Sequence, residues 1–255
     1  MHLHVINPNT DEAMTALIGE AARGAASPGT RITVSHPDMG PASIESHYDE
    51  ALAAPGVLVE IDRAQQAGAD GFVIACFGDP ALLAAREIAV GPVVGIAEGA
   101  MHAATLLGRG FSVVTSLQRT AGRAWDLASE YGFRERCLAV RAVEFDVLAI
   151  GDPASHAYER LHDESIAARD EDGADAIVLG CAGLADLCRR LTDDIGIPVV
   201  DGVAASVALV DGLVRLGLHG SARDEFAPPP PKPYLGLLAG FERPRPSSSS
   251  SSSSV

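Results

Sequence analysis

The sequence predicts an α/β fold of two pseudo-symmetric lobes, each a four-stranded parallel sheet flanked by helices, with the active site in the cleft between them. Two observations carry this prediction. Short Val- and Ile-rich segments alternate along the chain with Ala-rich segments of helical period, which is typical of parallel sheets covered by helices on both faces. In addition, one strand and its flanking residues occur twice in the chain.

Apolar segments bounded by Gly, Pro or Asn are expected to form the strands. They are Leu3–Ile6, Arg31–Ser35, Gly71–Ala75, Val93–Gly95, Phe111–Thr115, Leu138–Val143, Ala176–Leu179 and Val199–Asp201. The segments between them are expected to be helices, and Asp11–Arg23 and Leu58–Ala67 show a clear helical period. Each strand is thus followed by a helix, as a parallel sheet requires.

A further helix is expected over Ala81–Val90. Asp79 fits the N-cap of this helix, Pro80 fits its first position, and Gly91 fits the stop at its C-terminus. This assignment places a helix N-terminus just after Cys76.

The repeat covers a strand, the cysteine that follows it and the next strand. Residues 68–78 (GADGFVIACFG) match residues 173–183 (GADAIVLGCAG), at an offset of 181 − 76 = 105. Residues 91–94 (GPVV) match residues 197–200 (IPVV), at an offset of 198 − 92 = 106. Two matches at nearly one offset indicate duplication of a four-stranded α/β unit.

This duplication predicts the domain organisation. Residues 1–98 together with about 205–240 are expected to form the N-terminal lobe, and residues 99–204 the C-terminal lobe. Residues 241–255 are rich in Pro and Ser and are expected to be a disordered tail.

Composition narrows the class of function. Hydrophobic residues make up 47% of the chain, enough for a full core. The formal net charge is −15 and aromatic residues are only 5%, which argues against nucleic-acid and anionic-membrane partners. No signal peptide, long apolar span or disulfide pattern is evident, so a cytoplasmic protein with reduced thiols is expected.

Cys76 and Cys181 are the candidate catalytic residues. Both follow the carboxyl end of a predicted strand, and they occupy equivalent positions in the repeat. Ligands of open α/β sheets bind at the carboxyl ends of the strands, so two pseudo-symmetric lobes would bring these thiols face to face across the cleft. Cys137 and Cys188 have no such symmetry and are expected to be packing residues.

The predicted helix after Cys76 suggests an activated thiol. The N–H groups and the dipole at a helix N-terminus favour negative charge, and they lower the pKa of a nearby cysteine. We therefore expect a depressed pKa for the Cys76 thiol, and the same arrangement at Cys181.

Two opposed thiols suit racemisation. One, as thiolate, removes a proton from one face of a carbon, while the other, protonated, returns a proton to the opposite face. Backbone N–H groups can stabilise the enolate that forms, so no metal or organic cofactor is required. His2 and His4 lie on one face of the first strand, but without a third ligand nearby they are a weak candidate for a metal site.

The residues resemble the aspartate/glutamate/hydantoin racemase superfamily, and within it the hydantoin and allantoin racemases. The resemblance extends to about residue 240 and is carried by INPNT at 6–10, GPASIES at 40–46, ACFGDP at 75–80, VVTS at 113–116 and LGCAG at 179–183. The segment after Ser116 departs from the family pattern, which leaves the role of that loop open. The CFGDP string differs from the CNT-like motif of the free amino-acid racemases and points away from aspartate or glutamate as substrate.

This resemblance implies a cofactor-independent homo-oligomer that racemises 5-monosubstituted hydantoins or allantoin, with Cys76 and Cys181 as the acid/base pair. It places Asn7, Ser43, Ile44, Gly78, Ser116, Ala182 and Gly183 around the substrate. Asn7 also fits a simple turn with Pro8, and Phe77 fits either a wall of the pocket or the core.

Two alternatives remain open. Maleate isomerases of the same superfamily also use two cysteines, but one acts as a nucleophile. A two-lobed protein that binds a small molecule without catalysis is the alternative from another class, although such a protein has no need of matched thiols.

Overall fold

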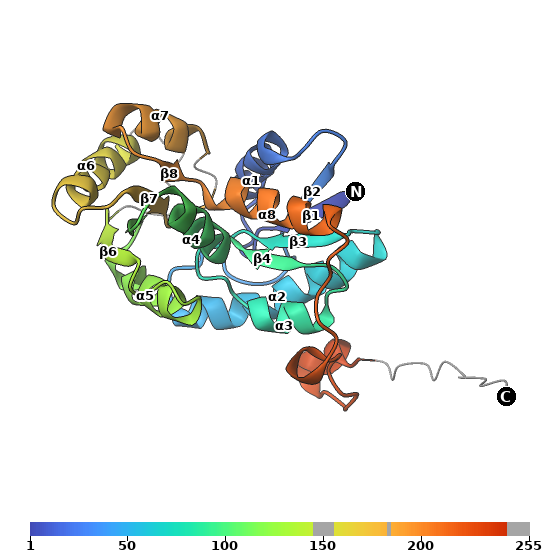
Figure 1. Ribbon diagram of the computed structural model, residues 1–255. Coiled ribbons are helices and arrows are strands. Elements are labelled where there is room, and N and C mark those ends of the chain that lie inside the picture. Colours follow the sequence, from blue (N-terminus) through green and yellow to red (C-terminus); the bar gives the residue numbers. More distant parts are fainter. Residues whose placement is uncertain (145–155, 183–184, 244–255) are drawn as a thin grey trace.

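The computed structural model describes residues 1–144, 156–182 and 185–243. Two four-stranded sheets, with all strand pairs parallel, form the centre of the fold (Figure 1). The first has the order β2-β1-β3-β4, with β1 (His2–Ile6), β2 (Arg31–Ser35), β3 (Gly71–Ile74) and β4 (Val93–Gly95). The second has the equivalent order β6-β5-β7-β8, with β5 (Phe111–Thr115), β6 (Cys137–Ala142), β7 (Ala176–Leu179) and β8 (Val199–Val200). The predicted fold class is confirmed.

A helix follows each strand along the chain. They are α1 (Glu12–Ala25), α2 (His47–Gln66), α3 (Leu82–Ile88), α4 (Ile96–Leu107), α5 (Ala121–Glu130), α6 (Ala157–Asp170), α7 (Ala185–Ile195) and α8 (Gly202–Arg215), with short 3-10 helices η1 (Gln118–Thr120), η4 (Asp224–Phe226) and η5 (Gly236–Phe241). None of the helices within the described ranges is both long enough and apolar enough to cross a membrane.

Apolar residues cover both faces of each sheet. Leu3 and Val5 of β1 pack towards α1 and α8, whereas Ile6 packs with Phe72 towards α2 and α3. In the second sheet, Phe111 packs with α4 and α5, and the opposite face packs against α6 and α7. Because both faces are buried, the strands are nearly continuous apolar runs.

The repeated Gly-Ala-Asp has the same structural role in both lobes. Gly68 and Gly173 follow α2 and α6 with φ of 81° and 72°, a left-handed conformation that glycine adopts without strain. The Asp70 carboxylate accepts a hydrogen bond from the backbone N–H of the first residue of β1 (2.7 Å). The Asp175 carboxylate accepts one from the residue just before β5 (3.1 Å). Each aspartate thus ties the central strand of its lobe to the neighbouring strand.

Helix α2 is much longer than the sequence predicted. It begins at His47 rather than Leu58, because Ser46 caps it by accepting a hydrogen bond from the Asp49 N–H (3.2 Å). Pro55 lies inside the helix and interrupts the pattern that sequence analysis relies on. The additional N-terminal half of α2 reaches the site described below.

Two assignments around α3 are wrong. The N-cap of α3 is Ala81, in a left-handed conformation (φ 60°) and without a side-chain cap, so Asp79 and Pro80 lie outside the helix. The helix ends at Ile88, before Gly91. Gly91 is instead required by a close approach, because a Cβ there would lie 1.9 Å from the Asp70 carbonyl oxygen.

The chain returns to the first sheet through α8. This helix packs against α1, α4 and β3, while α4 also contacts β7 and β8 of the second sheet (Figure 1). Residues 99 and 204, the predicted bounds of the C-terminal lobe, lie in the first turns of α4 and α8. Of the expected tail, Phe241 ends η5 and Arg243 forms an ion pair with Asp62 (2.8 Å), whereas residues 244–255 lie outside the described part.

Candidate active site

A cavity of about 410 Å³ lies where the carboxyl ends of β1, β3, β5 and β7 meet. Asn7 follows β1, Cys76 follows β3, Ser116 follows β5 and Cys181 follows β7, and all four line this cavity. Both central strands of both sheets therefore contribute to one site, as expected for parallel sheets that bind ligands at their carboxyl edges.

Most of the residues predicted to surround the substrate line this cavity. Besides the two cysteines they are Asn7, Ile44, Phe77, Gly78, Ser116 and Ala182. Ser43 does not line it: its hydroxyl donates to Glu45 (2.8 Å), which does. Gly183 lies outside the described residues.

Two groups of polar residues line the cavity without having been predicted from the sequence. The first comes from the segment that leads into α2 and from its first turn: Glu45, Ser46, His47, Tyr48 and Glu50. The second comes from η1 and the start of α5: Arg119, Thr120 and Arg123. The Ser46-x-x-Asp49 spacing, typical of a helix N-terminus, was the available signal for the first group. No comparable signal existed for the second.

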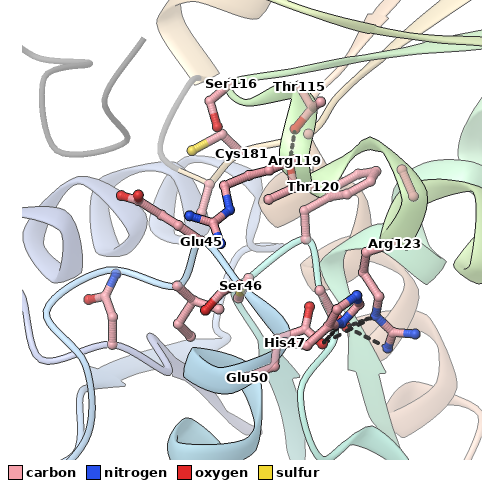
Figure 2. A pocket seen from close by; sticks show the side chains of 18 of the residues that line it. Glu45, Ser46, His47, Glu50, Thr115, Ser116, Arg119, Thr120, Arg123 and Cys181 are labelled. Carbon is pink, nitrogen blue, oxygen red and sulfur yellow. Dashed lines mark hydrogen bonds and ion pairs between the residues drawn. The ribbon is translucent and has the colours of Figure 1, made fainter. Parts of the chain in front are cut away.

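Charged side chains surround the polar part of the pocket (Figure 2). In this view Ser116 and Cys181 lie in the upper part and Ser46 and Glu50 in the lower part, and Arg119 extends into the space between. Arg123 of α5 donates two hydrogen bonds to the carbonyl oxygen of Gly78 (2.8 and 3.2 Å) and pairs with Glu50 (3.5 Å). The site can therefore offer a substrate both hydrogen-bond donors and acceptors.

Gly78 lies directly against the Glu50 carboxyl group. A Cβ at this position would lie 2.5 Å from the Glu50 Oε1 atom. Burial raises the pKa of Glu50, against the opposing effect of Arg123. The loop that carries Cys76 thus packs tightly on a partly buried carboxyl group of α2.

The two thiols are partly buried, and the pKa of each is raised to about 12, mainly by burial. The prediction of a depressed pKa is therefore wrong. No helix begins directly after Cys76, and the backbone N–H groups of Gly78 and Ala182 only partly offset the loss of solvation.

The thiols lie within electrostatic range of each other, because Cys181 contributes to the raised pKa of Cys76. Glu50 and Asp79 also raise the pKa of Cys76, whereas none of the carboxylates in the described part of the chain contributes at Cys181. The two sulfur atoms thus share one cavity but differ in their surroundings.

Asn7 has structural partners for its amide group. Its Nδ2 donates to Asn9 Oδ1 (2.6 Å), to Thr15 Oγ1 (2.9 Å) and to the Asp11 carbonyl oxygen (3.2 Å). The residue is 1% exposed. These bonds hold the loop after β1 against α1, and Asn7 lies at the wall of the cavity.

The two histidines of β1 and the other two cysteines lie outside the cavity and have partners of their own. Both ring nitrogens of His2 and of His4 have protein partners, at 2.7 to 2.9 Å. Within the described ranges, no cluster of three or more His, Cys, Asp or Glu side chains is suited to hold a metal ion. Cys137 and Cys188 are buried in apolar clusters, as predicted.

The fold and site together define a two-lobed α/β protein with one thiol from each lobe in a shared cavity. The Asp/Glu/Hydantoin racemase family profile matches residues 3–210, and the chain belongs to this family. It is accordingly an isomerase of the racemase class.

Individual relatives are similar over nearly their full length. A hydantoin racemase from Pseudomonas sp. (strain NS671) is 45% identical and covers 95% of this chain and 98% of its own. A hydantoin racemase from Rhizobium meliloti is 44% identical, covering 92% and 98%. The solved structure of an allantoin racemase from Klebsiella pneumoniae has a TM-score of 0.92 and 48% identity, covering 95% of this chain and 99% of its own.

Proposed function

We propose that this protein is a cofactor-independent racemase that inverts C5 of 5-monosubstituted hydantoins, with Cys76 and Cys181 as the acid/base pair. The observation that carries the proposal is the arrangement of the two thiols. They follow equivalent strands of two equivalent sheets, line one cavity and interact electrostatically. The hydantoin racemases that are 44–45% identical supply the substrate class.

The proposed reaction is a pair of proton transfers. The thiolate of one cysteine takes the C5 proton, and the electron pair left on C5 is delocalised into the neighbouring ring carbonyl as an enolate. The thiol of the other cysteine gives its proton to the opposite face of C5, and the two cysteines end with their protonation states exchanged. Backbone N–H groups of the loops after β3 and β7 are the donors we expect to stabilise the enolate oxygen.

The raised thiol pKa values fit this chemistry. Burial makes each thiolate a stronger base than a solvated one, which favours removal of a proton from carbon. The same burial keeps the partner cysteine protonated at neutral pH, as the acid step requires. The cost is that only a small fraction of either thiol is ionised in the free enzyme.

The cavity suits a small ring. Its volume of about 410 Å³ falls within the range of small-molecule sites, roughly 300–1,000 Å³. Ile44, Phe77 and Ala182 supply apolar wall, and Gly78 and Ser116 lie beside the thiols at the strand ends. We assign these residues and Asn7 to substrate binding, with Ser43 acting only through Glu45.

Racemisation of allantoin is the second candidate. It is favoured by the 48% identity to the Klebsiella pneumoniae allantoin racemase and by the charged groups of the pocket, Glu45 and Arg119 among them, which suit a polar group on C5. A panel of hydantoins with apolar and polar C5 groups, together with allantoin, separates the two candidates by their kcat/KM values.

The test is the decay of optical rotation of single enantiomers, with deuterium uptake at C5 followed by NMR in D₂O. We expect both to proceed, and to be unaffected by EDTA. Unchanged rotation across the hydantoin panel and allantoin would contradict the proposal.

We further propose that the protein acts as a cytoplasmic homo-oligomer without nucleic-acid or membrane partners. The net charge of −15 supports the second part, because it repels polyanions. Size-exclusion chromatography with light scattering measures the subunit number, and a monomeric mass would contradict the oligomer.

A further inference from the structure

The loop that carries Cys76 is anchored by the lobe to which it does not belong. Residues 75–81 connect β3 to α3 in the first lobe. One backbone bond keeps this loop on its own sheet, from the Ala75 N–H to the Ile6 carbonyl oxygen of β1 (2.8 Å). The hydrogen bonds that involve a side chain run instead to α4, the helix between the lobes, and to α5 and the residue that follows it in the second lobe. Cys181 belongs to that second lobe, so these contacts fix the loop of Cys76 relative to the lobe that carries Cys181.

The conformation of this loop requires support. Asp79 has φ of 45° and Ala81 has φ of 60°, two left-handed non-glycine residues separated only by Pro80. Such residues are sterically strained, and they persist only when surrounding contacts hold them. The Asp79 N–H donates to the Cys76 carbonyl oxygen (2.9 Å), so the strained turn begins at the cysteine itself.

The Asp79 carboxylate supplies most of that support. It is 3% exposed and accepts hydrogen bonds from the backbone N–H groups of Ala97 (3.1 Å) and Glu98 (3.0 Å), which caps α4. It also accepts one from the hydroxyl of Tyr131, the residue that follows α5 (2.7 Å). The space for it depends on Gly95, where a Cβ would lie 2.2 Å from the carboxyl carbon of Asp79.

A second contact from α5 reaches the same loop. The guanidinium group of Arg123 is bonded twice to the Gly78 carbonyl oxygen and is paired with Glu50. Arg123 and Tyr131 of the second lobe therefore hydrogen-bond to two successive residues of the Cys76 loop, Gly78 and Asp79. At Cys181, the Gly180 N–H makes the equivalent bond to β5 (2.8 Å) and the Ala182 N–H lies beside the thiol, but among the described residues no hydrogen bond from the first lobe reaches residues 180–182.

We propose that Asp79, Tyr131 and Arg123 form a clamp that sets the position of the Cys76 sulfur relative to Cys181, and that Asp79 and Tyr131 are positioning residues for the acid/base pair. The claim that the clamp fixes the position of Cys76 depends only on the hydrogen bonds. The claim that this position matters for proton transfer rests on the proposed function.

The clamp predicts an asymmetric defect. In Tyr131→Phe the ring remains and one bond to Asp79 is lost. We expect kcat to fall about tenfold in both directions with little change in KM, because misplacement of a reacting group by 1 Å can cost on the order of a hundredfold. In D₂O, the enantiomer deprotonated by Cys181 should still exchange its C5 proton at nearly the normal rate, whereas exchange of the other enantiomer should fall together with racemisation.

A second readout needs no substrate. The rate of iodoacetamide labelling of each cysteine is measured by peptide mass mapping on the folded protein. Loss of the clamp should raise the labelling rate of Cys76 severalfold and leave that of Cys181 unchanged. If the protein proved not to be a racemase, this ratio would still test the clamp, so failure of the proposed function and failure of the clamp are distinguishable.

Matched controls are available in the chain. Tyr158→Phe removes a tyrosine–aspartate bond between α6 and α7, to Asp194, away from the lining of the cavity. Asp175→Asn is the control for Asp79→Asn, because Asp175 also accepts from two backbone N–H groups, at 2.7 and 3.1 Å. Both controls should leave the labelling ratio and the exchange asymmetry unchanged. Equal effects on the two cysteines and on the two enantiomers, or no effect of Tyr131→Phe and Asp79→Asn, would overturn the proposal.

Discussion

At the scale of single residues, the two thiols of the cavity occupy equivalent positions in different electrostatic surroundings. Cys76 lies near the carboxyl groups of Glu50 and Asp79, both of which oppose its ionisation, while burial dominates at Cys181. The duplicated fold therefore places the two thiols at equivalent positions, but the charged side chains around them differ. The exchange of roles between acid and base makes both sulfurs necessary.

Replacement of either cysteine should separate exchange from racemisation. Cys76→Ser and Cys181→Ser should each nearly abolish racemisation, because a hydroxyl ionises far less readily than a thiol. Each variant should retain C5 proton exchange of one enantiomer, and the two variants should retain opposite enantiomers. Polarimetry and NMR in D₂O measure the two rates.

The controls for this experiment are the two cysteines outside the cavity. Cys137→Ala and Cys188→Ala should remain active, since both side chains lie in apolar clusters. Normal racemisation by Cys181→Ser, or a stable mass increase on Cys76 during turnover, would exclude the two-thiol acid/base mechanism.

The pH dependence follows from the raised thiol pKa values. With the pKa of both thiols near 12, the ionised fraction grows about tenfold for each pH unit in the neutral range. We expect log(kcat/KM) to rise with a slope close to one between about pH 6 and 8. A flat profile over this range would indicate a thiolate already formed at neutral pH and would contradict the raised pKa values.

At the scale of elements, the seam between β1, β2 and α2 is a continuous chain of hydrogen bonds. Arg31 contacts His2, His2 and His4 both contact Thr33, and His4 contacts Ser35, at 2.7 to 2.9 Å. Ser35 in turn donates to the buried Glu60 of α2 (2.5 Å). Arginine only donates and a carboxylate only accepts, so these bonds can all run in one direction, with Nδ1 of each histidine accepting and Nε2 donating.

This seam makes the fold sensitive to acid. Burial, reinforced by His2, lowers the pKa of His4 from 6.5 to about 4, so the unfolded chain binds a proton in a range where the folded chain does not. The free energy of unfolding should therefore fall as pH drops from about 6.5 to about 4, by on the order of 3 kcal/mol from this residue. Above pH 6.5 the contribution is constant.

Urea unfolding at several pH values measures this contribution. His4→Gln should be less stable at neutral pH but should lose much of the decline below pH 6.5. His219→Gln, at an exposed histidine, is the control and should keep the wild-type dependence. An unchanged slope in His4→Gln would show that other groups cause the decline.

At the scale of the whole molecule, the lobes share contacts at the helices between the two sheets. Helix α4 packs against α8 on one side and against β7 and β8 on the other (Figure 1). The Ser206 hydroxyl of α8 donates to the Gly95 carbonyl oxygen (3.1 Å), and a Cβ at Gly99 would lie 2.1 Å from that hydroxyl oxygen. The packing of α4 on α8 therefore depends on glycine at the contact.

We expect the two lobes to unfold together. Trp125, the single tryptophan, lies on α5, so its fluorescence reports on the second lobe, whereas far-UV circular dichroism reports on both. The two urea transitions should coincide. Gly99→Ala should lower the midpoint because α8 must move, while Gly24→Ala, where a Cβ meets nothing within 4 Å, should leave it unchanged or raise it. Separate transitions for the two probes would show independent lobes.

Much of the fold could be predicted because its signals are local. The eight predicted strands match β1 to β8 within one or two residues at each end. Because both faces of each sheet are buried, each strand is a run of apolar residues that can be recognised in the sequence. The duplication was visible because Gly68 and Gly173, and likewise Asp70 and Asp175, have the same role in each lobe. The start of α2 was missed because Pro55 interrupts the pattern of the helix.

The sequence by itself determined the strands, the duplication and the position of Cys76 and Cys181 at equivalent strand ends. Only the tertiary structure decided which helix Asp79 caps, which charged residues reach the cavity, and that the thiols have raised rather than lowered pKa values. The physical reason is the distance along the chain between the residues that determine each feature. A strand and its end are recorded in neighbouring residues, whereas desolvation and capping depend on groups that folding brings together, such as Asp79 and Tyr131, which are 52 positions apart.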